Sequence, residues 1–274
     1  MGLEDSHHIA EIVIHPRNPD IVYAAAMGHL FSSNEERGVF RTTDGGATWE
    51  KVLYINDRVG VVDLCIDPSR PEILYAAAYD KRRTPWHFEA GGEKSGIYKT
   101  TDSGETWRKL FGGLPQGTLG RIGIAVHRKD PDILYAVIQN LNPDPRYEAE
   151  EQGFDEFTDH SYDHLIGGEV YRTSDAGASW EKVSEDGVDV SGKAAYSFNE
   201  ISVDPHDPDK VYIIGVYMQY SFDGGRTWPR SWRERDRFLR NFGDVRVFWI
   251  DPHDPEHMML GSDGGLYSTW DGGR

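Results

Sequence analysis

Residues 42–49 read Thr-Thr-Asp-Gly-Gly-Ala-Thr-Trp, and this motif recurs along the chain. Three further copies of the pattern Ser/Thr-x-Asp-x-Gly-x-Ser/Thr-Trp begin at Thr100, Thr173 and Ser221. A fifth copy begins at Thr269 and reaches Arg274 before its Thr-Trp pair. The aspartates of the five copies are Asp44, Asp102, Asp175, Asp223 and Asp271. A self-similar unit of roughly 45 residues predicts a radial β-propeller or a related repeat array.

A second element recurs once before each copy of the motif. It consists of an apolar run rich in β-formers, a turn built on Asp-Pro or Pro-Asp steps, and a second apolar run. The turns begin at His15, Asp67, His127, Asp204 and Asp251. A third run leads into the Asp motif, and the residues after its tryptophan begin a fourth. The repeat therefore predicts four antiparallel strands per unit.

The predicted fold is all-β: a β-propeller of four-stranded antiparallel blades with Asp-box hairpins, about five of them in this chain. We expect one domain over 1–274, with blades at about 6–54, 58–111, 119–184, 196–230 and 243–274. The sequence offers four full units and most of a fifth, and the expectation is a part of a larger propeller, adjoining other blades of a longer chain. The alternative is that the last blade is completed by an uncommon arrangement.

The composition of the Asp box indicates a structural role for its aspartate. Asp accepts hydrogen bonds from the turn's own N–H groups, Gly supplies a positive φ, and the hydroxyl bonds locally. The Asp-Pro turn and the Asp box are expected at one end of each sheet. The long, dissimilar loops then lie at the other end, where we expect function.

Charge and composition exclude several classes of function. The formal net charge of −17 argues against nucleic-acid binding. No run of 18 apolar residues is present, so no membrane-spanning helix is expected, and no signal peptide is recognisable. Cys65 is the single cysteine, which excludes an intrachain disulfide.

These motifs resemble the BNR or Asp-box repeat proteins: sialidases, xyloglucanase-type glycoside hydrolases, photosystem assembly factors and the sortilin (Vps10) ectodomain. The likeness is greatest to large bacterial propeller proteins described as glycosyl hydrolase-like or sortilin-like. It is carried by Asn34–Gly46, Leu119–Gly123, Trp249–Pro252 and Gly261–Gly265 as well as the boxes. The resemblance implies an extracellular or periplasmic location. The arginine cluster of sialidases is not visible, which disfavours that activity.

Alignment of the five first strands on the Asp-Pro turn gives a set of candidate catalytic residues. One position carries Glu11, Asp63, Gly123, Glu200 and Val247, and Asp244 lies further along the last strand. Paired carboxylates are what glycoside hydrolysis requires, one as acid and the other as base or nucleophile. The candidate catalytic residues are thus Glu11, Asp63, Glu200 and Asp244. The alternative is that these groups solvate a central channel or pair with Arg121 and Arg246.

Candidate ligand-binding residues lie beside these acids and in the long insertions. His8, Arg121 and Arg246 come from the first strands, Arg83 and Trp86 from residues 79–94, and Trp232 from residues 226–240. A third insertion, 139–168, is strongly acidic. Exposed aromatic rings suit sugar stacking or peptide capture, and arginine suits carboxylates. The alternative is that the acidic and basic loops pair with one another.

Two hypotheses of function remain open at this point. The first is a secreted carbohydrate-active protein that binds or hydrolyses a polysaccharide at the mouth of the channel; if the protein is an enzyme, it is a glycoside hydrolase. The second is a non-catalytic, sortilin-like module that binds a peptide or protein ligand. Neither hypothesis calls for a metal or another cofactor.

Overall fold

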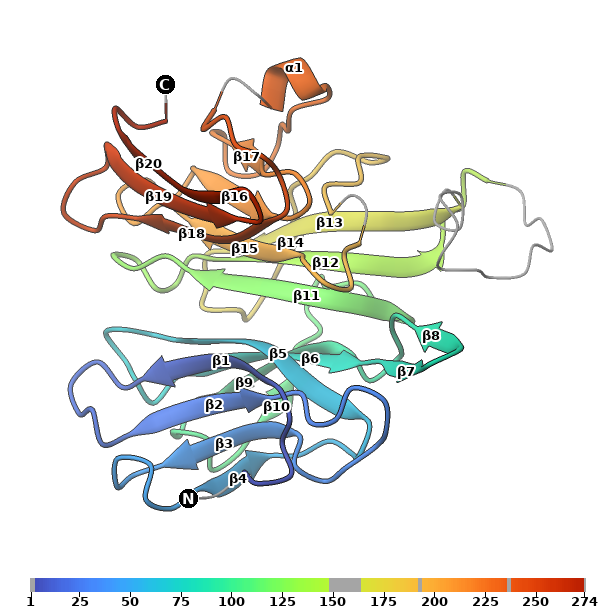
Figure 1. Ribbon diagram of the computed structural model, residues 1–274, viewed down its shortest axis with the longest axis vertical. Helices are drawn as coiled ribbons and strands as arrows, with labels where there is room; N and C mark the ends of the chain where they lie inside the picture. Colours follow the sequence, from blue (N-terminus) through green and yellow to red (C-terminus); the bar gives the residue numbers. More distant parts are fainter. Residues whose placement is uncertain (1–2, 148–163, 192–193, 236–237, 274) are drawn as a thin grey trace. The chain divides into compact units, whose positions relative to one another are not determined.

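The computed structural model describes residues 3–147, 164–191, 194–235 and 238–273 (Figure 1). Within these ranges the chain is all-β apart from one short helix, α1 (Trp232–Arg235). Within these ranges the strands form three four-stranded sheets, two three-stranded sheets and one separate two-stranded hairpin, and the described strand pairs are antiparallel. The predicted all-β architecture of repeated antiparallel sheets is confirmed.

The chain divides into two compact units, which we describe separately. Unit 1 comprises residues 1–111, 115–124 and 140–166, and unit 2 comprises residues 112–114, 125–139 and 167–274. The first two sheets belong to unit 1 and the last two to unit 2, whereas the third contributes residues to each.

The strand bounds follow the repeat closely. The first sheet contains β1 (Ile9–Ile14), β2 (Val22–Ala26), β3 (Gly38–Thr42) and β4 (Glu50–Leu53). The second contains β5 (Val59–Ile66), β6 (Leu74–Asp80), β9 (Gly96–Thr100) and β10 (Arg108–Lys109). The third contains β11 (Leu119–Val126), β12 (Leu134–Pro143), β13 (Leu165–Thr173) and β14 (Glu181–Lys182). The fourth contains β15 (Glu200–Val203), β16 (Val211–Ile214) and β17 (Gln219–Ser221), and the fifth β18 (Val245–Ile250), β19 (His257–Ser262) and β20 (Gly265–Trp270).

Each Asp box lies against the Asp-Pro turn of its own sheet. The residue after the box aspartate donates its backbone N–H to a carbonyl in that turn in all five units. The five bonds are Gly45 to Asp20, Ser103 to Glu72, Ala176 to Asp132, Gly224 to Asp209, and Gly272 to Glu256. Both connections therefore lie at the same end of each sheet, as predicted.

The side-chain bonds inside the box explain its residue types. In the first box, Thr42 Oγ1 donates to Asp44 Oδ1 at 2.8 Å and accepts the Gly46 N–H at 2.9 Å. Thr48 closes the other side, since its N–H and hydroxyl donate to the Asp44 carboxylate at 2.9 and 2.6 Å. Hydrogen bonds from the closing Thr or Ser lower the pKa of Asp44, Asp102 and Asp175 to about 2.

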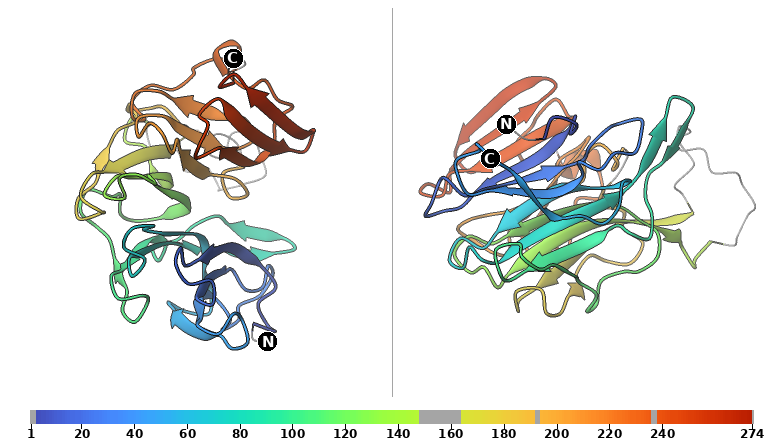
Figure 2. Two further views of the ribbon diagram at one scale, coloured as in Figure 1. Left: turned by 90° about the vertical axis from the view of Figure 1, so that its left-hand side faces the viewer. Right: turned by 90° about the horizontal axis from the view of Figure 1, so that it is seen from below.

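The connection from β6 to β9 contains the hairpin of β7 (Arg82–Thr84) and β8 (His87–Glu89). It leaves β6 at the end of the second sheet opposite the Asp box, and Figure 2 shows it projecting beyond the strands of that sheet. This insertion supplies most of the basic side chains considered below.

The fourth and fifth sheets differ from the prediction of four strands in each unit, because each has three described strands. In the fourth unit the box tryptophan, Trp228, precedes Pro229, where the first three units continue with Glu-Lys or Arg-Lys. Proline has no N–H to donate to a ladder. The chain instead enters α1, where Ser231 Oγ accepts the Glu234 N–H at 3.3 Å.

The apolar positions of the first strands are buried or half-buried in four sheets and are more exposed in the first. Leu64 and Ile201 are buried, whereas the equivalent Ile12 and its neighbour Ile14 are each 58% exposed. Val13, which points the opposite way, packs with Leu64 in a core that also contains Tyr23 and Val39. The first sheet of unit 1 therefore has one covered face and one exposed face.

The search for membrane-spanning helices, restricted to the described residues, finds none of the required length and hydropathy.

Candidate functional site

The strand register places three of the predicted acids at equivalent positions. Glu11 pairs with Ala25, Asp63 with Ala77, and Glu200 with Ile214. Each partner lies two residues after the tyrosine of its second strand, namely Tyr23, Tyr75 and Tyr212. In β18 the equivalent residue is Val247, paired with Gly261.

A β-bulge lies just before this position in β1, β5 and β18. The extra residues are Ala10, Val62 and Arg246, where the register shifts by one. Bulges re-aim the side chains that follow them and often lie beside functional sites. The sequence pattern alone did not reveal these bulges, because the extra residue leaves the apolar spacing below it unchanged.

In unit 1 the structure brings Glu11 and Asp63 to neighbouring strands. The Ile124 N–H donates to Asp63 Oδ2 at 2.8 Å, so this half-buried carboxylate is tied to β11, while Glu11 is exposed. Both lie close to Cys65, whose pKa is raised well above its ordinary value by burial and then by the charges of Asp63, Glu11 and Asp67. The two acids therefore share one local environment around a single thiol.

The other two candidate acids belong to unit 2. Glu200 is half-buried on β15, and Asp244 precedes β18 with a φ of 47°. The Asp244 N–H donates to the Val216 carbonyl at 2.8 Å. Arg246 lies with its guanidinium 4.3 Å from the centroid of the Phe198 ring and donates to Asp263 Oδ1 at 3.3 Å.

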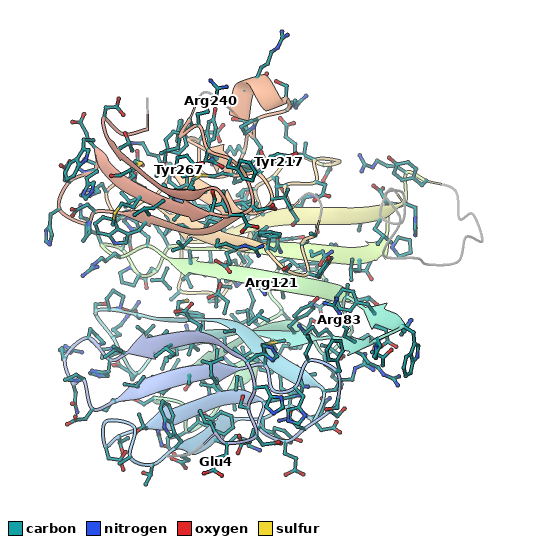
Figure 3. The ribbon with its side chains drawn as sticks, in the orientation of Figure 1. Glu4, Arg83, Arg121, Tyr217, Arg240 and Tyr267 are labelled. Atoms are coloured by element: carbon teal, nitrogen blue, oxygen red, sulfur yellow. The ribbon has the colours of Figure 1, made fainter. Side chains whose placement is uncertain are left out.

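The remaining predicted ligand-binding residues have different surroundings. His8 is exposed, with Nδ1 3.1 Å from the Gly28 carbonyl, and Trp86 is 83% exposed beside the turn between β7 and β8. Arg83 and Arg121 are half-buried in unit 1 (Figure 3). The side chain of Trp232 and residues 148–163 of the acidic insertion lie outside the described residues.

Unit 1 contains a basic pocket that sequence patterns did not reveal as a single site. It has a volume of about 160 Å³ and is formed by the loop 29–37 together with Arg58 and residues 81–84. Its cationic lining residues are Arg37, Arg58, Lys81, Arg82 and Arg83. They come from three separate segments, and of these only Arg83 was predicted to bind a ligand.

Carboxylates balance only part of this charge. Arg58 is paired with Asp80 at 2.8 Å and Glu89 at 2.7 Å, and Arg82 lies 4.0 Å from Glu89. Among the described residues, no carboxylate oxygen lies within 4.0 Å of a side-chain nitrogen of Arg37, Lys81 or Arg83.

The walls of the pocket hold these cations in place. Arg37 is 3% exposed and donates to the backbone carbonyls of Met27, His29, Ser32 and Arg58. The Arg83 guanidinium lies over the faces of two aromatic rings, 6.0 Å from the Phe31 centroid and 5.4 Å from that of Phe88. Arginine packed on aromatic faces keeps its N–H edge available to an anion.

The environment of Lys81 disfavours the protonated, charged form of its side chain. Burial, followed by the positive charges of Arg121, Arg37 and Arg83, lowers the pKa of Lys81 to about 8. Arg121 on β11 thus acts on the pocket electrostatically, although it is not among the lining residues.

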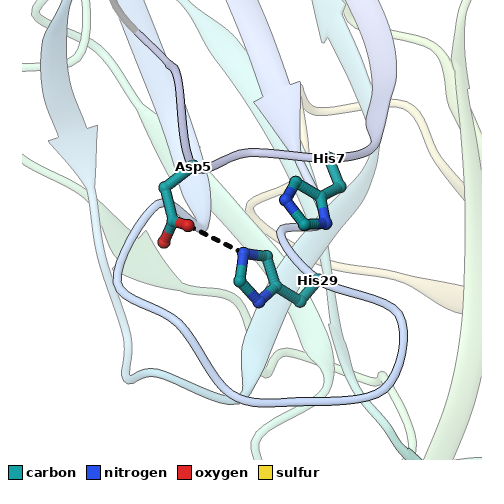
Figure 4. Close-up of side chains that lie close together, drawn as sticks. All are labelled: Asp5, His7 and His29. Atoms are coloured by element: carbon teal, nitrogen blue, oxygen red, sulfur yellow. Dashed lines mark hydrogen bonds and ion pairs between the residues drawn. The ribbon is translucent and has the colours of Figure 1, made fainter.

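An acid–histidine cluster braces the loop that forms one wall of the pocket (Figure 4). His29 Nε2 lies 2.9 Å from Asp5 Oδ1, and Asn34 Nδ2 donates to the Asp5 backbone carbonyl at 2.7 Å. Candidate ligand atoms of Asp5, His7 and His29 lie within 4.8 Å of one another. The two imidazole rings are stacked, with centroids 3.9 Å apart and planes 17° from parallel, so their in-plane lone pairs do not converge on one ion. In this arrangement the cluster ties the N-terminal segment to residues 29–34.

Comparisons with known proteins agree with the architecture. No family model matches the chain. A xyloglucanase from Paenibacillus sp. is 24% identical over 310 residues, covering 94% of this chain and 26% of that protein. The vacuolar protein sorting/targeting protein 10 of Colletotrichum graminicola is 30% identical over 104 residues, covering 38% of this chain and 6% of that protein. Among solved structures, the GH74 xyloglucanase from Xanthomonas campestris matches 95% of this chain and 36% of its own chain, with a TM-score of 0.58 and 17% identity.

The chain is therefore a distant relative of the GH74 xyloglucanases and of Vps10, both Asp-box propeller proteins, and its sheets match part of a GH74 propeller. The resemblance stated from the motifs is confirmed. The chain spans about a quarter of the length of the Paenibacillus xyloglucanase, of which 26% is covered.

Proposed function

We propose that this chain forms part of the polysaccharide-binding surface of a secreted, carbohydrate-active propeller protein. The observation that carries the proposal is the placement of Glu11 and Asp63 at equivalent register positions on β1 and β5 of one unit. The distant relation to xyloglucanases supports a glycan as the ligand. Carboxylates beside bulged strands suit hydrogen bonding to sugar hydroxyls and, as a pair, glycosidic chemistry.

The surroundings of the two acids assign them different roles in the hydrolytic form of the proposal. The Ile124 N–H donates to Asp63 Oδ2 and holds that carboxylate in place, so Asp63 is assigned as the base or nucleophile. Glu11 on the neighbouring strand is then the acid that protonates the leaving oxygen. Glu200 and Asp244 are the corresponding candidates of unit 2.

The test uses amide variants, which keep the size of each side chain and remove its charge. The double variant E11Q/D63N retains an amide oxygen to accept the Ile124 N–H. The control, E72Q/E93Q, likewise replaces two carboxylates by amides, at exposed glutamates whose side chains form no hydrogen bond or ion pair among the described residues. Binding is measured by affinity electrophoresis in xyloglucan and in polygalacturonate, and hydrolysis by the release of reducing ends.

The proposal predicts retarded migration of the wild-type chain in at least one polysaccharide gel. It predicts a loss of about tenfold or more in affinity for E11Q/D63N, as expected for the loss of charge-assisted hydrogen bonds, and no change for the control. Migration of the wild type unaffected by either polysaccharide, or equal affinity of both double variants, would contradict it. Capture of peptides in place of glycans would favour the Vps10-like alternative.

A further inference from the structure

The basic pocket of unit 1 holds more positive charge than its ion pairs neutralise. Five cationic side chains line it, and the two carboxylates paired with them, Asp80 and Glu89, are both engaged with Arg58. Arg37, Lys81 and Arg83 are left without an ion pair among the described residues. This occurs in a chain whose formal net charge is −17, so unit 1 keeps local positive charge against the overall balance.

This arrangement is costly for an empty pocket. A buried cation is normally paired, and like charges close together destabilise one another. Arg37 Nε is buried and has no hydrogen-bond partner among the described residues, although the other guanidinium nitrogens donate to four carbonyls. Sites that violate the usual rules of charge pairing are often functional, since the bound ligand supplies the missing partner.

The available donor groups indicate which kind of anion would fit the pocket. The Arg37 terminal nitrogens are occupied by carbonyls, so this residue contributes mainly its charge. The Lys81 ammonium and the Arg83 guanidinium remain as free donor groups. Two cationic donors match the two oxygens of one planar carboxylate, which guanidinium groups bind well.

An aromatic side chain beside the donors adds a surface for a ring. Phe31 lines the pocket and is 53% exposed, and Trp86, 83% exposed, lies in the turn of the β7–β8 hairpin that carries Arg83. Exposed aromatic faces next to cationic donors suit a ligand that combines an apolar ring face with an acidic group, and sugar acids have this combination.

We propose that this pocket binds the carboxylate group of an acidic polysaccharide, with Lys81 and Arg83 as its direct partners and Arg37 as the charge behind them. The inference rests on the proposed polysaccharide-binding function and names the class of polysaccharide. The Asp5, His29 and Asn34 contacts hold the loop that carries Phe31 and so position one wall of the site.

The experiment is isothermal titration of the whole chain with three matched oligosaccharides. The probes are an oligogalacturonate, the same oligomer with methyl-esterified carboxyls, and a dextran sulfate oligosaccharide. The variants are K81M and R83M. The controls, K94M and R108M, make the same chemical changes at exposed side chains with no hydrogen bond or ion pair among the described residues.

The proposal predicts that the acidic oligogalacturonate binds the wild type and both controls. It predicts a loss of about tenfold or more for K81M, for R83M and for the methyl ester, the size expected when one charge-assisted bond is removed. Binding of the sulfated oligosaccharide alone would overturn the carboxylate assignment. Equal binding of the methyl ester and the acid would overturn the pocket proposal and leave polysaccharide binding intact. Failure of all three probes, with xyloglucan still retarding the chain, would again remove only the pocket.

Stability provides a readout that separates a ligand-binding lysine from a structural one. Replacing a structural lysine lowers the unfolding midpoint, whereas removal of an unpaired, desolvated charge raises it. K81M is therefore expected to unfold at a higher denaturant concentration than the wild type and K94M while binding the acid less tightly. A lower midpoint for K81M together with unchanged binding would assign Lys81 to the fold.

Discussion

Replacement of the first hydroxyl of an Asp box by a methyl group tests the structural role of the motif. Thr100 is 1% exposed, and its Oγ1 donates to Asp102 Oδ1 at 2.7 Å. The same oxygen accepts the buried Gly104 N–H at 3.0 Å and the Asp102 N–H at 3.3 Å. The T100V variant has almost the same shape and lacks all three bonds. The matched control is T101V at the next, exposed position.

The expected magnitude follows from the two shorter of these bonds. A hydrogen bond to a charged group contributes about 1.5–3 kcal/mol, and an unsatisfied buried N–H costs about 1–3 kcal/mol. Because the two effects share one hydroxyl, we expect a loss of about 2–4 kcal/mol in the free energy of unfolding. The control is expected to change it by no more than about 0.5 kcal/mol, as is usual for exposed positions.

Urea denaturation followed by tryptophan fluorescence measures both variants. The same substitution at Thr269 provides a graded comparison, because the hydrogen bond from the Thr269 hydroxyl to Asp271 is exposed. We expect T269V to cost clearly less than T100V. Equal midpoints for T100V and T101V would show that the box is not held by its hydroxyl, and the structural account of the motif would be wrong.

Three further predictions concern charge and backbone geometry. The pKa of Asp102 is lowered to about 2 from 3.8, so the stabilising effect of its carboxylate is complete above pH 4 and is lost as the pH falls toward 2. Urea midpoints measured at pH 5, 3 and 2 should therefore fall less for the D102N variant than for the wild type. The pKa of Lys81 is lowered to about 8 from 10.5, so the unfolded chain binds more protons than the folded chain between these two pH values. The stability of the wild type relative to K81M should therefore rise from pH 8 to 10.5, with Arg37, Arg83 and Arg121 charged throughout. A constant difference in stability between the two proteins would refute this prediction. Gly38 has a φ of 108°, and an added Cβ would lie 1.9 Å from the Leu53 carbonyl oxygen, whereas Gly265 has a φ of 121° and open space around it. In thermal unfolding, the G38A variant should therefore lose more stability than G265A, which carries only backbone strain of about 1–3 kcal/mol.

The architecture could be predicted from the sequence because its signals are local. The box bonds join residues two to four positions apart, and the Asp-Pro turn is similarly short. Each motif therefore forms wherever its residues occur, and five copies fix the repeat. Pro229 was visible in the sequence as well, but the loss of a fourth strand depends on which ladder that residue would have joined.

The sites were harder to predict because they depend on long-range geometry. Alignment on the Asp-Pro turn placed Glu11 and Asp63 at one register position, which the pairing reproduces. The basic pocket joins Arg37 to Lys81 across two sheets, and no spacing in the sequence connects them. The exposure of Ile12 shows the same limit, since its spacing matches that of buried Leu64 and only the presence of a covering sheet separates the two.

A crystal structure of the chain soaked with an oligogalacturonate tests the central claim most directly. The account predicts density for one carboxylate between the Lys81 ammonium and the Arg83 guanidinium, with a sugar ring against Phe31. An empty pocket at a concentration that saturates binding in solution, with the oligosaccharide bound elsewhere on the chain, would contradict it.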